Sequence, residues 1–251
     1  MPTIAERRAA FRALHQSGCF AIPNPWDGGS ARLMQEAGFK ALASTSAGAA
    51  WALAKNDGEM TADEVLEHLR FLVGAADLPV NADFEAGFAD TADGVAANVT
   101  RCVETGVAGL SIEDRTGNDL YPIEVAVERI RAARAAIDRS GADVVLVGRC
   151  EAYLMKPVDM DEVIRRLKAY GEAGADCLYA PGLKELGQFA RKVRELDKPI
   201  NANITGTGLS VADMAGVGVR RVSVGAALAR AMWTAVDGHI ALLAKEGRLP
   251  S

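Results

Sequence analysis

The chain contains 251 residues, of which 49% are hydrophobic and 24% are charged, and its formal net charge at pH 7 is -5. This composition is typical of a globular protein and excludes a disordered or fibrous chain. Because the net charge is negative, no overall field attracts nucleic acid or an anionic membrane surface, and we expect neither as a partner.

Eight short apolar runs recur along the chain, and none of them shows a clear polar alternation. Continuous apolar runs of this length are typical of strands that are buried on both faces of a parallel sheet. In chain order the predicted strands are Phe20–Pro23, Ala41–Ser44, Pro79–Asp83, Gly109–Glu113, Val144–Arg149, Cys177–Ala180, Pro199–Ile204 and Arg221–Val224.

Helical patterns fill the gaps between these runs. Thr61 precedes two acidic residues and predicts the start of a helix, and glycines at 38, 106, 141 and 174 predict helix ends. Eight strands that alternate with helices predict an α/β fold, a (β/α)8 TIM barrel, which occupies residues 1–251 as a single domain. A doubly wound sheet is the alternative, but six or fewer strands would suit it better.

The last helical segment, residues 226–247, is longer and more apolar than a helix that covers one barrel needs. It is expected either to dock on another subunit or to close its own barrel.

The cysteines and the N-terminus bear on the cellular compartment. The four cysteines are far apart and form no C-x-x-C pair, which argues against a disulfide framework or a structural zinc site. Residues 1–18 indicate an amphipathic helix rather than a signal peptide. No apolar stretch reaches the roughly 20 residues needed to cross a membrane. We therefore expect a soluble cytoplasmic protein.

Acidic residues gather where the predicted strands end, which is where active sites of this fold lie. Asp83 and Glu85 follow the third strand, Glu113 ends the fourth, and Asp57 lies in the loop after the second. Two carboxylates about 4 Å apart repel by about 4 kcal/mol at an effective dielectric near 20. A hard cation would relieve this repulsion, and Mg²⁺, with Mn²⁺ as the other candidate, suits an all-oxygen set. The alternative is that each carboxylate pairs with a basic residue of the barrel or caps a loop.

Arg149 follows a strongly apolar strand and is a candidate clamp for a carboxylate or phosphate, which a planar guanidinium binds well. The alternative is a structural salt bridge to Glu113 or Glu151.

Neutral donors follow two other strands. Thr45, Ser46 and the next backbone N–H groups, starting with Ala47, could hold an anionic oxygen. Asn203 and Thr205 offer neutral donors after the seventh strand. With Arg149 they form the predicted binding site for a small anion that carries a carboxylate or a phosphate.

Some chemistries lack the residues that they need. No lysine in an apolar setting ends a strand, as a Schiff base would require. All three histidines lie in helical patterns, which argues against a histidine-based triad, and no G-x-x-x-x-G-K-[ST] phosphate loop exists.

Seven segments occur in an order and at a spacing that resemble one known family. They are Pro23–Asp27 (PNPWD), Ser44–Trp51 (STSAGAAW), Asn56–Met60 (NDGEM), Asp83–Phe88 (DFEAGF), Ser111–Arg115 (SIEDR), Gly148–Ala152 (GRCEA) and Asn201–Thr205 (NANIT). The chain resembles the isocitrate lyase/phosphoenolpyruvate mutase superfamily along nearly its whole length, and most closely the small phosphonomutase-like branch.

This resemblance implies a (β/α)8 barrel whose last helix is exchanged with a neighbouring subunit, usually in a tetramer, so we expect a homo-oligomer, either a dimer or a tetramer. It implies one Mg²⁺ ion that Asp83 binds directly. Asp57, Glu85 and Glu113 match positions that hold the ion largely through water.

The resemblance also implies how substrate is bound. Arg149 matches the arginine that binds the substrate, and the pair Thr45 and Ser46 matches a Ser-Gly pair whose amides hold a substrate carboxylate. Asn203 and Thr205 match the N-x-T of the lyases, although the glutamate that usually follows is Gly206.

One departure bears on the subclass. The isocitrate and methylisocitrate lyases carry K-K-C-G-H after the fourth strand, and its cysteine is their catalytic acid/base. Residues 115–122 contain neither cysteine nor histidine. The sequence therefore argues against isocitrate cleavage by that mechanism.

The resemblance implies chemistry through a metal-stabilised pyruvate enolate. We expect a Mg²⁺-dependent lyase or decarboxylase that cleaves a C–C bond of a small 2-oxo or 2-hydroxy carboxylate, with Arg149, Glu113 and Asp57 taking part in catalysis. The alternative is C–P chemistry, as a phosphoenolpyruvate/phosphonopyruvate mutase or a phosphonopyruvate hydrolase, and the short loop at residues 115–122 argues against it. A third reading is a non-catalytic barrel that keeps the metal site.

Overall fold

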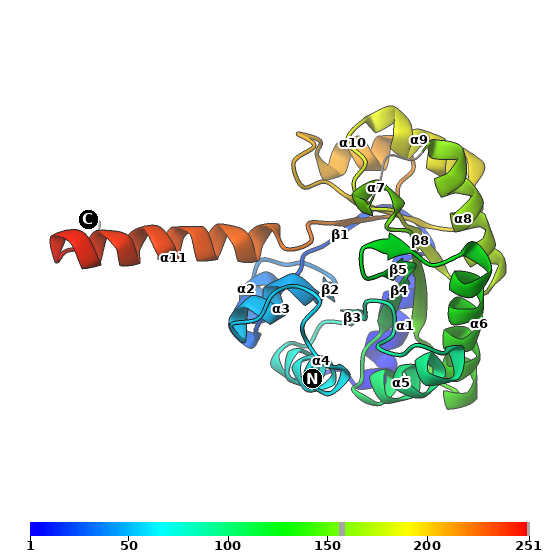
Figure 1. Ribbon diagram of the computed structural model, residues 1–251, viewed down its shortest axis with the longest axis horizontal. Coiled ribbons are helices and arrows are strands. Elements are labelled where there is room, and N and C mark those ends of the chain that lie inside the picture. The colour runs from blue at the N-terminus through cyan, green and yellow to red at the C-terminus, as the bar shows by residue number, and fades with distance from the viewer. Residues whose placement is uncertain (156–158, 250–251) are drawn as a thin grey trace.

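A computed structural model describes residues 1–155 and 159–249 of the chain. A sheet of eight parallel strands forms its centre (Figure 1). The strands are β1 (Phe20–Ile22), β2 (Leu42–Ala43), β3 (Val80–Asp83), β4 (Gly109–Glu113), β7 (Val145–Arg149), β8 (Cys177–Tyr179), β9 (Ile200–Asn203) and β10 (Arg221–Ser223). A separate antiparallel hairpin consists of β5 (Arg115–Thr116) and β6 (Asp119–Leu120).

The sheet closes into a barrel. Its strands are hydrogen-bonded in the order β1-β10-β9-β8-β7-β4-β3-β2. Ala43 N donates to the Pro23 carbonyl, just after β1, at 3.0 Å and joins the two ends of that order. Each predicted apolar run contains one strand and exceeds it by at most one residue at either end. The predicted (β/α)8 TIM barrel is therefore confirmed.

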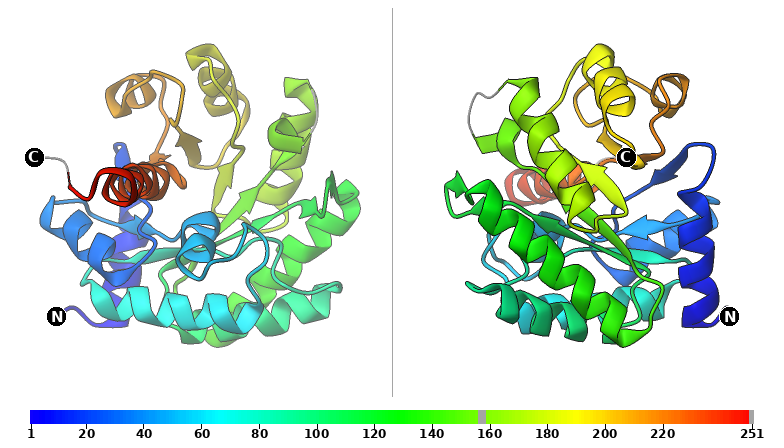
Figure 2. Two further views of the ribbon diagram at one scale, coloured as in Figure 1. Left: turned by 60° about the vertical axis from the view of Figure 1, so that its left-hand side comes forward. Right: turned by 90° about the vertical axis from the view of Figure 1, so that its right-hand side faces the viewer.

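Helices follow the strands and surround the sheet (Figure 2). They are α1 (Ile4–Leu14), α2 (Gly28–Glu36), α3 (Ser46–Ala52), α4 (Ala62–Ala75), α5 (Ala92–Glu104), α6 (Ile123–Ser140), α7 (Ala152–Met155), α8 (Met160–Glu172), α9 (Leu186–Glu195), α10 (Val211–Gly216) and α11 (Ala227–Glu246). Thr61 caps α4 as predicted, because its side chain accepts from Glu64 N while the Glu64 carboxylate accepts from Thr61 N. Such a capping box satisfies two N–H groups that the helix itself leaves unpaired.

Helix α1 closes the amino-terminal end of the barrel. Arg7, Arg8 and Arg12 donate to backbone carbonyls at the ends of α4 and α5 and at the starts of β4 and β7. Between these anchors the Phe11 ring is fully buried and packs edge-on against His15 and Phe20. The opposite end of the barrel, where the strands finish, is the open one.

Helix α11 projects away from the barrel (Figure 1). Ala229 is its only buried residue, whereas Trp233, Val236, Ile240 and Leu243 are exposed. The alternative that this segment closes its own barrel is therefore wrong, because the helix leaves the barrel after its first turn.

The cysteines and the membrane prediction can also be compared with the structure. All four cysteines are free, which agrees with the absence of a predicted disulfide framework. Within residues 1–155 and 159–249, no helix combines the length and the apolar character that a bilayer span requires.

Candidate active site

The carboxyl ends of β3, β4 and β7 place three charged residues side by side. Asp83, Glu113 and Arg149 are the last residues of these strands, and the parallel register aligns Glu113 with Arg149. Active sites of this fold lie at this end of the barrel. The structure thus brings together two of the predicted metal ligands and the predicted substrate-binding arginine.

Arg149 is surrounded by carboxylates. Its Nη1 donates to Asp83 Oδ1 at 2.9 Å, and its Nε donates to Glu151 Oε1 at 2.6 Å and lies 3.3 Å from Glu113 Oε2. The salt bridges to Glu113 and Glu151 that the sequence offered as the structural alternative are therefore present. Burial alone would lower the pKa of Arg149, but these carboxylates raise it above its ordinary value, so the guanidinium stays charged.

Two carboxyl groups near Arg149 are harder to ionise than a free glutamate. Burial, together with the charges of Asp83 and Asp57, raises the pKa of Glu85 to about 7, and its Oε1 is buried without a hydrogen-bond partner. Burial also raises the pKa of Glu113 to about 8, although Arg149 acts in the opposite direction. One guanidinium does not neutralise the acidic side chains around it.

The loop after β3 holds Glu85 in an uncommon backbone conformation. Glu85 and Phe88 have φ angles of 44° and 54°, in the left-handed region that residues other than glycine rarely adopt. The buried Arg129 of α6 fixes this loop, because its guanidinium donates to three loop carbonyls at 2.6 to 3.1 Å. Its Cζ also lies 4.4 Å from the centre of the Tyr121 ring. Backbone strain of this kind persists where the surroundings enforce it, and it clusters at functional sites.

The start of α3 approaches the acidic group from the other side. Thr45 is the N-cap of α3, and its Oγ1 accepts from Gly48 N at 3.4 Å. Ser46 N donates to Asp83 Oδ2 at 3.1 Å, and Ser46 Oγ donates to Asp57 Oδ1 at 2.9 Å. The amide of Ser46, predicted to hold a substrate oxygen, therefore holds Asp83 in this structure.

The two residues predicted after β9 are placed differently from each other. Asn203 Nδ2 donates to the Tyr179 hydroxyl at 3.4 Å, and Asn203 shares a cavity with Arg149. Thr205 Oγ1 donates to the Val224 carbonyl at 2.7 Å, and Thr205 lines a separate cavity beside α11. Asn203 faces the candidate site, whereas Thr205 lies outside the two cavities at the mouth.

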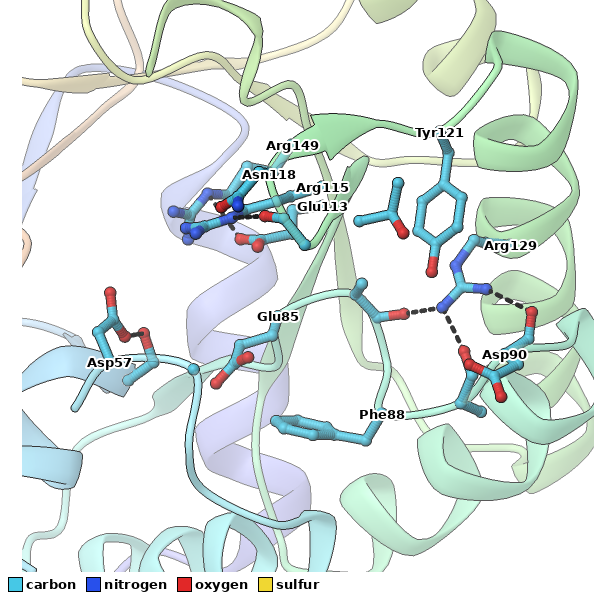
Figure 3. A pocket seen from close by; sticks show the side chains of 16 residues that line it. Asp57, Glu85, Phe88, Asp90, Glu113, Arg115, Asn118, Tyr121, Arg129 and Arg149 are labelled. Carbon is cyan, nitrogen blue, oxygen red and sulfur yellow. Dashed lines mark hydrogen bonds and ion pairs between the residues drawn. The ribbon is translucent and has the colours of Figure 1, made fainter. Parts of the chain in front are cut away.

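Two adjoining cavities open at the mouth of the barrel. The larger, of about 580 Å³, is bordered by Asp57, Glu85, Glu113 and Arg149 (Figure 3). The smaller, of about 200 Å³, reaches residues near the starts of the strands, and its upper part is lined by Thr45, Ser46, Ala47, Asp83, Asn203 and Arg149. Apart from Thr205, every predicted site residue therefore borders one or both cavities.

The larger cavity also has a wall that the sequence analysis did not predict. This wall comes from the hairpin β5–β6, the loop after β3 and helix α6. It contains Phe88, Arg115, Asn118, Tyr121 and Arg129. The hairpin directly follows Glu113, so its closeness to the mouth could have been inferred. Arg129 gave no such signal, because an arginine within a helical pattern is usually a surface residue.

The donor set can be tested against the implied metal ion. Within the described part of the chain, no three acidic, histidine or cysteine side chains are grouped as a preformed metal site. Oε1 of Glu85 is buried without a partner, the charges of Asp83 and Asp57 act on Glu85, and all the side chains offered are oxygen donors. Mg²⁺ keeps several of its waters and takes one or two carboxylates. The residues therefore fit a hydrated magnesium ion with few direct protein ligands.

Comparison with known proteins gives a consistent result. The family model described as phosphoenolpyruvate phosphomutase matches residues 11–243. The chain is 34% identical over 211 residues to the 2-methylisocitrate lyase of Escherichia coli (strain K12), which covers 79% of this chain and 70% of that protein. It is 32% identical over 255 residues to oxaloacetate decarboxylase 1 of Pseudomonas putida (strain W619), which covers 94% of this chain and 80% of that one.

The fold gives the same assignment. The structure of a 2,3-dimethylmalate lyase, a member of the PEP mutase/isocitrate lyase superfamily, matches with a TM-score of 0.88 and 27% identity. The match covers 100% of this chain and 90% of that one. The chain thus belongs to the phosphoenolpyruvate phosphomutase family, within the isocitrate lyase/phosphoenolpyruvate mutase superfamily.

Proposed function

We propose that the protein is a Mg²⁺-dependent lyase or decarboxylase that cleaves a C–C bond of a small 2-oxo or 2-hydroxy carboxylate through an enolate of pyruvate. The observation that supports this most is the surplus of carboxylates around Arg149 at the mouth of the barrel. Relatives in the family are named for lyase or decarboxylase reactions of small carboxylic acids.

The metal proposal assigns roles to four carboxylates. Asp83 would hold the ion directly, and Asp57, Glu85 and Glu113 would hold it through water. When bound, the ion supplies positive charge against the oxygen of the enolate as the C–C bond breaks. Mn²⁺ offers the same chemistry with the same ligands.

Arg149 binds the anionic end of the substrate in this proposal. Glu151 and Asp83 already fix the plane of its guanidinium through Nε and Nη1. Its Nη2 has no hydrogen-bond partner among the residues that the structure describes. The guanidinium is therefore oriented in advance with a donor left for a carboxylate, which reduces the entropy lost on binding. Thr45, Ser46, Ala47 and Asn203 border the same space and complete the binding site, with Thr205 behind Asn203.

Asp57 and Glu113 are the proposed catalytic carboxylates. Ser46 holds Oδ1 of Asp57, and Asp57 Oδ2 has no partner in the described ranges, so this oxygen can hold or deliver a proton at the reacting carbon. Glu113 lies against Arg149 at the closed side of the cavity. Both carboxylates therefore border the proposed substrate position, Glu113 from the end of β4 and Asp57 from the loop between α3 and α4.

A screen for pyruvate release tests the proposal. Oxaloacetate, 2-methylmalate-type acids and phosphonopyruvate are supplied in parallel, with Mg²⁺ or with EDTA. We expect pyruvate to be released from oxaloacetate or from a 2-methylmalate-type acid. We expect this release to be lost in EDTA. No turnover of any acid would leave only a non-catalytic barrel, and turnover that survives EDTA would exclude the metal.

C–P chemistry is the second candidate, and the description of the matching family model favours it. The short hairpin at Arg115–Leu120 argues against it, because it leaves little chain to shield a phosphoryl group from water. Preferential turnover of phosphonopyruvate in the same screen would reverse our choice.

We also propose that the protein is a cytoplasmic homo-oligomer, a dimer or a tetramer. Its free cysteines suit a reducing compartment. The exposed apolar face of α11 suits exchange of this helix with another subunit.

A further inference from the structure

Arg221 places a positive charge inside the barrel, below the mouth. It is the first residue of β10, and only 3% of it is exposed. Its Nε donates to Asn201 Oδ1 at 2.8 Å, and its Nη1 donates to Asn81 Oδ1 at 3.1 Å. Both acceptors are neutral amides, and Arg221 forms no ion pair within the described part of the chain. The structure thus contains a buried guanidinium without a counter-ion.

Such a charge is unfavourable unless an anion accompanies it. Arginine remains protonated even when buried, so it cannot avoid the penalty by losing a proton. Burial lowers the pKa of Arg221, and the groups that offset this most are Cys177 and Tyr179. Burial raises the pKa of both of these groups, so they are neutral at physiological pH. The protein therefore supplies no compensating negative charge of its own at this position.

The space around Arg221 is a polar cavity of about 200 Å³. Besides Arg221, its lining includes neutral hydrogen-bonding side chains, namely Asn24, Asn81, Ser111, Asn201 and Ser223. Its upper lining contains Asp83 and Arg149. A single cavity therefore connects the candidate active site with the buried cation.

The far end of this cavity is closed. Phe11 enters the barrel from α1 and is fully buried, and His15 and Phe20 pack edge-on around it. Gly109 makes room for this arrangement, because a Cβ there would lie 2.6 Å from Asn81 Oδ1 and 2.7 Å from the Phe11 ring. A ligand would therefore reach Arg221 from the mouth, past Arg149.

We propose that Arg221 and the amides around it form a second carboxylate subsite, and that the protein selects 2-oxo dicarboxylates over monocarboxylates. This inference rests on the proposed function: one end of the acid binds at Arg149, and its other carboxylate points down the barrel to Arg221. A carboxylate supplies the missing negative charge and accepts charge-assisted hydrogen bonds from the guanidinium. The small volume of the cavity suits a compact carboxylate.

Binding of malonate and of pyruvate, measured by titration calorimetry in saturating Mg²⁺, tests this subsite. Malonate has two carboxylates, whereas pyruvate has one. We expect Arg221→Met to weaken malonate binding about 10- to 100-fold, the effect of losing charge-assisted hydrogen bonds, and to change pyruvate binding less than about 2-fold. Arg220→Met is the matched control, because Arg220 precedes Arg221 and donates to the Gly18 carbonyl instead of lining the cavity. It should leave both affinities unchanged.

Arg221→Lys guards against a Met variant that does not fold. Lysine keeps the charge but loses the planar guanidinium group. We therefore expect the affinity for malonate to fall about 3- to 10-fold and the affinity for pyruvate to stay unchanged. An equal loss for both ligands would show a purely structural role and overturn the subsite. Unchanged malonate binding, or no preference of the wild-type protein for malonate over pyruvate, would also overturn it.

The two proposals fail in different ways. If malonate binds through Arg221 but no 2-oxo acid is cleaved, the lyase function is wrong and the subsite stands. If 2-oxo acids are cleaved while Arg221→Met binds malonate like the wild-type protein, the function stands and the subsite is wrong.

Discussion

The geometry of Arg149 leaves room for a structural and a proposed functional role in one side chain. The sequence presented a salt bridge and a substrate clamp as alternatives, but the geometry is compatible with both. Nε and Nη1 bind Glu151 and Asp83, and Nη2 has no partner within the described ranges. A guanidinium can do this because its donors lie in one rigid plane and point in different directions.

The Arg149→Lys substitution tests whether this planar arrangement matters. Lysine keeps the charge but presents a single ammonium group, which cannot hold two carboxylates and bind a substrate in one fixed plane. We expect kcat/KM to fall about 10- to 100-fold, the scale set by losing a charge-assisted hydrogen bond. Steady-state kinetics on the acid identified by the pyruvate screen measures this effect, with the exposed Arg194→Lys as the control. Wild-type kinetics in Arg149→Lys would remove Arg149 from substrate binding.

His15 makes a residue-scale prediction about stability and pH. Burial, with the charge of Arg221 second, lowers the pKa of His15 to about 4, and Nδ1 is bonded to the Phe11 carbonyl at 2.8 Å. Because the pKa in the folded state lies below the value near 6.5 of the unfolded chain, the unfolded chain binds the proton more readily. The stability that comes from a neutral His15 is therefore complete above about pH 6.5 and is lost as the pH falls towards 4. The full effect is about 3 kcal/mol.

His15→Gln removes this titration and keeps a neutral donor. We expect the free energy of unfolding of the variant to fall less steeply than that of the wild-type protein between about pH 6.5 and pH 4.5. Urea unfolding at several pH values measures both slopes. Parallel slopes would show that His15 does not titrate differently in the two states.

At the scale of an element, α11 is the helix whose packing partner is missing. Trp233, Val236, Ile240 and Leu243 are spaced three or four residues apart, so they lie along one side of the helix, and all are exposed. An apolar stripe of this kind on a projecting helix is typical of an interface.

We expect the double substitution Ile240→Glu with Leu243→Glu to break the oligomer. Each change places a charge on the apolar stripe, where docking would have to bury it at a high cost. Light scattering coupled to size exclusion should show a mass that is a multiple of 26.4 kDa for the wild-type chain and a lower multiple for the variant. Lys245→Gln, a polar change near the same end of α11, is the control. A wild-type mass of one chain would contradict the proposed subunit exchange.

At the scale of the whole molecule, the parts that could be predicted follow from local pattern. Each barrel strand is buried on both faces, so it appears as an apolar run, and polar residues after a run mark the mouth. The inward or outward direction of a side chain could not be predicted in this way. Arg221 is the first residue of the last predicted strand and resembles a flanking surface charge, yet the register of β10 against β9 turns it into the barrel. The contacts of Arg129 could not be predicted either. They depend on the packing of α6 against the loop after β3, whose carbonyls Arg129 binds.

Because acidic side chains gather at the mouth, we expect binding of a divalent cation there to raise the stability of the entire barrel. The strands bring Asp83, Glu85 and Glu113 together only in the folded chain, so we expect Mg²⁺ to bind the folded state and to stabilise it. At a concentration 100 times its Kd this amounts to about 2.7 kcal/mol, or a rise in Tm of about 5 to 10 °C for a chain of this size. Calorimetry with Mg²⁺ and with EDTA measures the rise, which Asp83→Ala should abolish without loss of cooperative unfolding. The exposed Asp197→Ala, which leaves the mouth intact, should keep it. An equal Tm with Mg²⁺ and with EDTA in the wild-type protein, or a rise that persists in Asp83→Ala, would contradict the proposed metal site.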